Sequence, residues 1–174
     1  MILKQEILSY IKEITKNAYK GYELQLDEIC KRLSIKHFIA GFEENISGMI
    51  KKNPDSGEFE IFVNRKHPLN RMRFTLAHEI GHYISCKFNS FSKEELEKEG
   101  SLADYATSYR KDGCYSDAET EANLIAATIL MPEDKVKEMV DQELTIEQMA
   151  DKFFVSPSAM TIRLQNLYPG LMVI

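Results

Sequence analysis

The stretch RFTLAHEIGHYI, residues 73–84, lies inside a segment that predicts an amphipathic helix over residues 71–86. The apolar positions with the spacing of one helical face are Phe74, Ala77, Ile80, Gly81 and Ile84. Two histidines, His78 and His82, are four residues apart on a neighbouring stripe, and Glu79 directly follows the first. The helix therefore combines a face that can enter a core with a group of polar side chains that indicates chemistry.

The spacing of the two histidines is that of a metal site. Residues four apart in a helix stand almost above one another, so His78 and His82 can each place a ring nitrogen about 2.0–2.1 Å from one Zn²⁺ ion. Glu79 projects from the adjacent position, where its carboxylate can take a proton from water as a general base. The alternative interpretation is a pair of solvated or capped histidines. Because HExxH lies within a segment of helical periodicity, the sequence favours a zinc site over this alternative.

A catalytic zinc needs a third protein ligand. Cys86 continues the histidine stripe, but it lies about 12 Å along the helix from His78, too far for a shared ion. Better candidates lie in SDAETEANLIAATILMP, residues 116–132, where Glu119 and Asn123 are four apart on one face of a second helix. Asn123 could hold a liganding histidine by a hydrogen bond.

Glu119 has competitors as the third ligand. Ser116 and Glu119 have the spacing of a capping box, which would employ the carboxylate at the start of the helix. The residues alone therefore leave the third ligand open among Glu119, Glu121, Asp117 and Cys114.

The remaining periodicity predicts a mixture of helices and strands. Helical spacing occurs in residues 2–20, from Leu26 to Leu33, in residues 117–131, and on both sides of FVSPS, residues 154–158. IKHFIAGF, residues 35–42, alternates like a strand, and the turn residues NPDSG indicate an antiparallel hairpin with strands near 46–52 and 58–64. Residues 87–115 predict a long, partly irregular excursion.

Composition limits the class of protein. The chain has 174 residues, 44% of them hydrophobic, and a formal net charge of −5. This charge argues against an electrostatic nucleic-acid binder. No apolar run has the roughly twenty residues of a membrane span, and the start lacks the order of a secretion signal. The three cysteines follow no CxxC spacing, so we expect reduced thiols and a cytoplasmic protein.

RFTLAHEIGH followed by ETEANLIAATILMP, with IFVN upstream, closely resembles the ImmA/IrrE family of zinc metallopeptidases. The resemblance implies that His78, His82 and Glu119 hold Zn²⁺, that Glu79 is the catalytic base and that Asn123 supports a ligand from the second shell. It also implies a protein substrate, a helix-turn-helix transcriptional repressor of a mobile element or a stress response, so that the enzyme would act as an anti-repressor.

The expected fold is α+β. A small antiparallel sheet would pack on helices that carry a zincin-like HExxH site in residues 1–143, and residues 144–174 would form a C-terminal helical, helix-turn-helix-like subdomain. The side chains of Thr145 to Ile174 carry two positive and two negative charges, so their formal charge is zero. We therefore expect this subdomain to be structural or to dock a repressor rather than to read DNA.

Two further features of the sequence could assist the reaction. If EIFVN, residues 60–64, lay at a sheet edge near the metal, it could bind the substrate backbone by strand addition. The candidate donors to the oxyanion are Tyr105, Tyr109, Tyr115, Arg73 and His67. The competing hypothesis is a non-catalytic, metal-stabilised regulatory module that binds a repressor, with a fourth ligand from Cys114, His67 or His37. The presence of Glu79 beside His78 favours the enzyme.

Overall fold

The computed structural model describes residues 1–90, 101–105 and 117–170. The helices are α1 Gln5–Thr15, α2 Leu26–Leu33, α3 Leu69–Lys87, α5 Asp117–Leu130, α6 Glu133–Asp141, α7 Ile146–Phe153 and α8 Pro157–Leu167. The strands are β1 Tyr19–Lys20, β2 Glu23–Leu24, β3 Lys36–Ala40, β4 Ile46–Lys52, β5 Phe59–Asn64 and β6 Ser101–Tyr105. Helices and strands occur together, so the α+β class is confirmed. Within these residues, no helix is both long and apolar enough to cross a membrane.

The main sheet is mixed rather than antiparallel. Its strand order is β3-β5-β4-β6. The predicted hairpin is confirmed, because β4 pairs antiparallel with β5, but β3 pairs parallel with β5. The chain reverses direction twice between β3 and β5, so β3 and β5 run the same way once they lie side by side. The expectation that the sheet would be antiparallel throughout was wrong for this non-local pair.

The same strand order corrects the expectation for EIFVN. β5, which contains it, lies between β3 and β4 and pairs with both. Its backbone groups are therefore engaged on both sides, and it cannot accept a substrate strand by edge addition.

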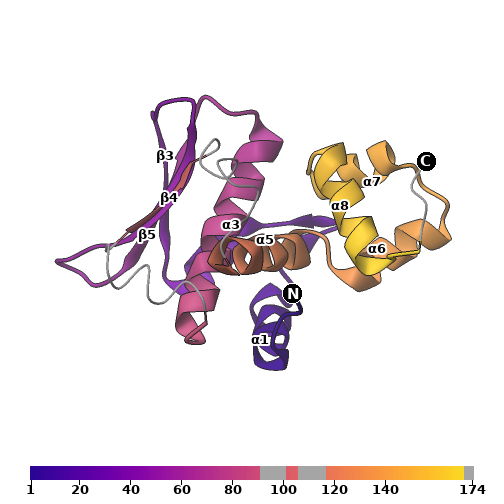
Figure 1. Ribbon diagram of the computed structural model, residues 1–174, viewed down its shortest axis with the longest axis horizontal. Coiled ribbons are helices and arrows are strands. Elements are labelled where there is room, and N and C mark those ends of the chain that lie inside the picture. Colours follow the sequence, from indigo (N-terminus) through magenta and orange to yellow (C-terminus); the bar gives the residue numbers. More distant parts are fainter. Residues whose placement is uncertain (91–100, 106–116, 171–174) are drawn as a thin grey trace.

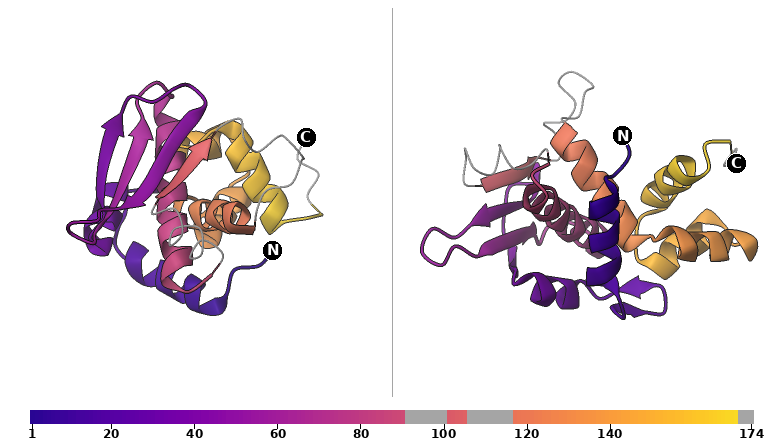
Figure 2. Two further views of the ribbon diagram at one scale, coloured as in Figure 1. Left: turned by 60° about the vertical axis from the view of Figure 1, so that its left-hand side comes forward. Right: turned by 90° about the horizontal axis from the view of Figure 1, so that it is seen from below.

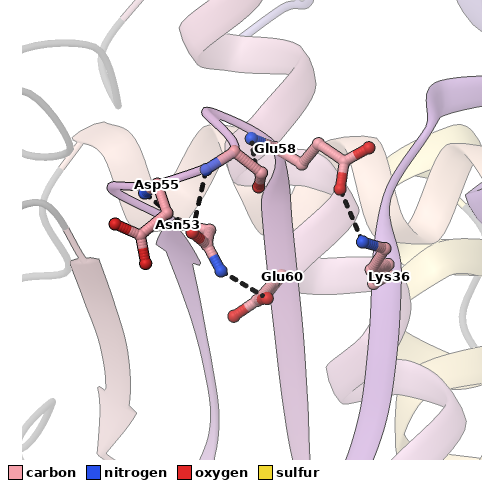
Figure 3. A network of polar contacts seen from close by, with 6 residues as sticks. Lys36, Asn53, Asp55, Glu58 and Glu60 are labelled. Carbon is pink, nitrogen blue, oxygen red and sulfur yellow. Dashed lines mark hydrogen bonds and ion pairs between the residues drawn. The ribbon is translucent and has the colours of Figure 1, made fainter.

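The turn of the hairpin is held by its own side chains (Figure 3). The Oδ1 atom of Asn53 accepts hydrogen bonds from the backbone N–H groups of Asp55 and Ser56 at 2.9 and 3.1 Å, and its Nδ2 donates to Glu60 at 3.0 Å. Gly57 adopts a φ of +73°, which glycine allows without strain. These contacts fix the register that places buried Ile50 opposite buried Ile61.

Helix α3 lies against one face of the sheet, and α5 crosses α3 on its other side (Figures 1 and 2). Ala77, Ile80 and Ile84 of the predicted apolar face are buried in the shared core. Burying an aliphatic side chain of this size contributes about 1.5–3 kcal/mol, so this face is sufficient to anchor the helix. The sheet and α5, which pack on opposite sides of α3, thus fix the positions of the HExxH residues His78, Glu79 and His82.

The N-terminal helix is shorter than its periodicity predicts. α1 ends at Thr15, and Asn17 adopts a φ of 58°, which turns the chain into the small β1-β2 hairpin. Leu24 of β2 and Ile7, Ile11 and Ile14 of α1 are buried in the core. The second predicted helix is confirmed as α2.

The two predicted C-terminal helices are present as α7 and α8. Thr145 and Gln148 form a reciprocal capping box at the start of α7, and the Ser156 side chain caps α8 by accepting from the Ala159 N–H. Ala150, Val155 and Leu164, the expected core of this segment, are buried. The division of the chain into residues 1–143 and 144–174 stays a prediction.

Candidate metal centre

Three potential ligands meet where α3 crosses α5. The Nε2 atoms of His78 and His82 are 3.0 Å apart. The Oε2 atom of Glu119 lies 3.1 Å from the first of these nitrogens, and its Oε1 lies 3.2 Å from the second. All three side chains are nearly buried. The structure therefore brings two imidazoles and one carboxylate to a single point inside the protein.

The distances among these atoms fit a metal ion. Donors bound to one tetrahedral Zn²⁺ at about 2.0–2.1 Å stand about 3.3 Å from one another. The two ring nitrogens are 3.0 Å apart, and each lies 3.1 or 3.2 Å from a different carboxylate oxygen of Glu119, so all three spacings approach this value. Electron-rich nitrogen and oxygen atoms at such distances repel one another unless a cation or protons lie among them. His78, His82 and Glu119 can thus hold one divalent ion.

Close contact between the two helices makes this meeting possible. Gly81 of α3 faces Ala122 of α5, and a Cβ atom at Gly81 would stand only 2.6 Å from the carbonyl oxygen of Ala122. Any side chain there would force the helices apart. His78 and His82 flank Gly81 in sequence, while Glu119 and Asn123 flank Ala122. The glycine thus allows ligands from separate helices to reach one another.

Asn123 orients one of the histidines. Its Oδ1 atom lies 3.0 Å from the Nδ1 atom of His78. An amide oxygen only accepts hydrogen bonds, so the Nδ1 atom carries the proton and the Nε2 atom presents a lone pair towards Glu119. This is the arrangement by which an outer partner sets the tautomer of a liganding histidine.

The environment keeps Glu119 ionised. Burial alone would raise the pKa of its carboxyl, but while no ion is bound, the hydrogen bonds and the charge of protonated His78 and His82 outweigh burial and hold the pKa well below its usual range. An ionised carboxylate is the form that binds a metal.

Glu121, another candidate for the third ligand, does not belong to the group formed by His78, His82 and Glu119. Its carboxylate accepts hydrogen bonds from the hydroxyl groups of Ser85 and Ser90 at 2.5 and 2.8 Å. Asp117 does not belong to the three-residue group and is exposed. Cys114 and Ser116, and with Ser116 the possible capping box, lie outside the described residues. Of the candidates that the structure describes, only Glu119 reaches both histidines.

Glu79 is fully buried beside the ligands. A Cβ atom at Gly48 of β4 would stand 3.5 Å from the Oε1 atom of Glu79 and 2.6 Å from the Cγ2 atom of Thr75. The carboxylate therefore lies between α3 and the sheet. Sequence reasoning missed the roles of Gly48 and Gly81, for which a glycine inside a strand or a helix was the available signal of close approach.

Several other predicted candidates have structural roles. Arg73 pairs with Glu23 at 3.2 Å and donates to the carbonyl oxygen of Leu24 at 3.0 Å. His67 contacts the carbonyl oxygen of Glu44 at 3.2 Å, and His37 lies 3.2 Å from Asp27. Cys86 does not belong to the three-residue group. The side chain of Tyr105, together with Tyr109 and Tyr115, lies outside the described part of the chain.

Comparison with known proteins agrees with this geometry. Residues 30–165 match the model of the IrrE N-terminal-like domain family. The chain is 37% identical over 82 residues to the radiation response metalloprotease IrrE of Deinococcus radiodurans, an alignment that covers 47% of this chain and 22% of that protein. The chain thus spans about a fifth of the length of this relative.

A solved structure shares the fold. A Mycobacterium tuberculosis transcriptional regulator superposes with a TM-score of 0.61 at 14% identity, over 93% of this chain and 47% of the regulator's chain. Because the family model spans more than half of its residues, the chain belongs to the IrrE N-terminal-like domain family, a family of metalloproteases.

Proposed function

We propose that this protein is a zinc-dependent metallopeptidase that cleaves a protein substrate at a specific site. The convergence of His78, His82 and Glu119 beside the buried Glu79 carries the proposal. This is the donor set of a catalytic zinc site, in which three protein side chains bind the ion and one position stays open.

Zn²⁺ is the metal that suits these ligands best. Two imidazole nitrogens and the carboxylate of Glu119, gathered within 3.0–3.2 Å of one another, match its preference for tetrahedral nitrogen and oxygen donors. When bound, the ion would supply Lewis-acid polarisation of the scissile carbonyl and lower the pKa of water.

The chain's own residues would then handle the proton. Glu79 accepts it from the attacking water and later delivers it to the nitrogen of the leaving amine. This carboxylate is fully buried and directly follows the ligand His78 in α3. Asn123 keeps His78 in the tautomer that faces the metal, and Glu119 contributes the negative charge of the ligand set.

The proposed substrate is a helix-turn-helix transcriptional repressor, whose removal would relieve repression of a mobile element or a stress response. The family supports a protein substrate. The fold shared with a transcriptional regulator is compatible with a role in transcription. Such a substrate would place the reaction in the cytoplasm. Residues 144–174, the predicted helix-turn-helix-like subdomain that includes α7 and α8, would then serve as a docking subdomain.

A non-catalytic module that binds metal and a repressor is the competing account. A structural zinc site is normally closed by four protein ligands. Within residues 1–90 and 117–170, no fourth histidine, cysteine, aspartate or glutamate joins the three. A set of three ligands, with the carboxylate of Glu79 next to them, supports the enzyme.

The test is co-expression with a helix-turn-helix repressor encoded beside the protein, comparing wild type with Glu79→Gln. We expect wild type to shorten the repressor, as read by mass spectrometry, and the variant to bind zinc but leave the repressor intact. If both proteins bind zinc and the repressor, and neither cuts, the binding module replaces the enzyme.

A further inference from the structure

A groove of about 650 Å³ lies beside the metal centre. Its walls come from the first turns of α3, one side of α5 and the facing side of α8, and Figure 1 shows these three helices around the same region. Asn123, whose Oδ1 atom contacts His78, lines the groove, and Phe74, one turn before His78, also belongs to its wall. A ligand in this groove would therefore lie next to the proposed catalytic site.

The floor of the groove is apolar. Its apolar side chains are Phe74, Leu124, Ala127, Met131 and Ile162. Ile162 on α8 is 58% exposed, so the rim presents hydrophobic surface to a partner. Polar side chains between these positions, such as Asn70, Thr120 and Asn166, can hydrogen-bond to a peptide backbone.

The charge of the groove is positive, whereas the net charge of the whole protein is negative. Among the residues that the structure describes, the groove is lined by two arginines, Arg71 and Arg163, and by no acidic residue, although the chain has a formal net charge of −5. Ser156 and Ser158, at the N-terminus of α8, also line it, and the partial positive charge of the helix end has the same sign. This local excess of positive charge complements a negatively charged ligand.

Arg163 is the strongest indication of such a ligand. Its side chain is only 6% exposed, and its Nε atom donates to the carbonyl oxygen of Met131 at 3.0 Å, just after the end of α5. A guanidinium has further N–H donors in a planar fork suited to a carboxylate. Arg71 donates to the hydroxyl of Ser47 at 3.0 Å. Within the part of the chain that the structure describes, neither arginine forms an ion pair with a carboxylate. Burial lowers the pKa of Arg163, and the charge of nearby Glu133 offsets this only in part.

The length of the groove suits a short extended peptide. Its wall on α5 runs from Thr120 to Met131, which corresponds to about 16 Å along a helix. An extended chain rises about 3.3 Å per residue, so about five residues fit. Nucleic acid is a poor match, because the floor is apolar and the protein as a whole is acidic.

We propose that this groove binds a stretch of about five residues of the protein substrate, in which an acidic side chain faces Arg163 and Arg71 and apolar neighbours lie on the floor. The inference rests on the proposed function for the identity of the ligand as a substrate, but binding itself does not require cleavage. It gives the peptidase a recognition site separate from the metal.

Binding can be measured by NMR on the full chain carrying Glu79→Gln, which prevents cleavage. The probes are two pools of pentapeptides, Ac-Ala-Φ-Glu-Φ-Ala-NH₂ and the same series with glutamine, where Φ is leucine, isoleucine, valine, methionine or phenylalanine. We expect the acidic pool to shift the amide signals of Ala127, Ala159 and Ile162 in a saturable way. The glutamine pool should bind at least tenfold more weakly.

Ile162→Glu tests the role of charge, because it adds a carboxylate at the exposed rim of the groove. It should weaken binding of the acidic pool at least fivefold. Ile162→Gln removes the same apolar contact and matches the size of the glutamate without its charge, so it should weaken binding clearly less than Ile162→Glu does. Ile39→Glu adds the same charge at a 68% exposed position of β3, away from the groove, and should have no effect.

Equal binding of the two pools, binding of neither, or shifts confined to other surfaces would overturn the proposal. These outcomes are distinct from failure of the proposed function. If the acidic pool binds in the groove while the wild-type protein cuts no repressor, the peptide-binding site is confirmed and the proposed peptidase function is wrong. If the wild type cuts a repressor and neither pool binds, the peptidase function is confirmed and the peptide-binding site is wrong.

Discussion

Gly81 of α3 lies directly against the backbone of Ala122 of α5, so close that a Cβ atom on the glycine would stand 2.6 Å from the carbonyl oxygen of the alanine. This contact sets the distance between the helix that carries His78 and His82 and the helix that carries Glu119. The geometry of the candidate metal centre therefore depends on a residue that binds nothing itself.

Substituting Gly81→Ala should separate the two helices. Overpacking of this kind lowers the free energy of unfolding by about 1–3 kcal/mol, which outweighs the gain in helix propensity. Zinc affinity should fall at least tenfold, because Glu119 would no longer reach both histidines. Calorimetric titration with zinc and urea denaturation measure the two effects. Gly170→Ala, where nothing lies within 4 Å of the added atom, is the control that should change neither.

Glu119 and Glu121 offer a matched pair of buried carboxylates on one helix. Glu119→Gln should abolish stoichiometric zinc binding, since the ligand charge is lost. Glu121→Gln should keep zinc but lower the free energy of unfolding by about 1–3 kcal/mol, because its hydrogen bonds with Ser85 and Ser90 are disturbed. Elemental analysis of the purified variants distinguishes them, and equal zinc content would contradict the assignment of Glu119.

Asn123→Ala should weaken zinc binding by about 10–100-fold, because the Nδ1 atom of His78 loses its acceptor. Asn123→Asp should restore most of the affinity, since a carboxylate oxygen accepts the same hydrogen bond. Competition with a coloured zinc chelator gives the affinities. Unchanged binding in the alanine variant would show that Asn123 acts only through packing.

The Cys30 thiol should be unreactive in the folded protein. It is 1% exposed, and burial raises its pKa from 9.0 to about 12. Iodoacetamide at pH 8 should therefore modify Cys86, which is half-buried, well before Cys30, and Cys30 only after unfolding. Peptide mapping by mass spectrometry reads both sites. Rapid modification of Cys30 in the native protein would contradict its placement in the core.

The same thiol should affect stability in alkali. The folded-state pKa lies above that of the unfolded chain, so this contribution to stability is fully present below about pH 9 and is lost as the pH rises towards 12. In Cys30→Ala, the decline of the unfolding free energy between pH 8 and 10 should be shallower than in wild type. Parallel urea titrations at the two pH values test this.

The elements that the sequence predicts well are those whose signal is local. The face of Ala77, Ile80 and Ile84 predicts α3, and the turn residues around Asn53 predict the hairpin, because each pattern concerns residues a few positions apart. His78, Glu79 and His82 stand out for the same reason. The shortening of α1 at Thr15 was missed, since the turn at Asn17 interrupts an otherwise regular apolar period.

Non-local features required the structure. The parallel pairing of β3 with β5 depends on which strands become neighbours, and alternation within one strand does not encode this. Likewise, Glu119 and Glu121 have the same chemistry on the same helix, and only the crossing at Gly81 and Ala122 decides which of them meets the histidines.

The most direct test of the account is a crystal structure of the zinc-loaded protein with data collected at the zinc absorption edge. The account predicts one zinc ion about 2.0–2.2 Å from the Nε2 atoms of His78 and His82 and from the carboxylate of Glu119, with an open position facing Glu79. A zinc ion bound elsewhere, or a fourth protein side chain that closes this position, would contradict it.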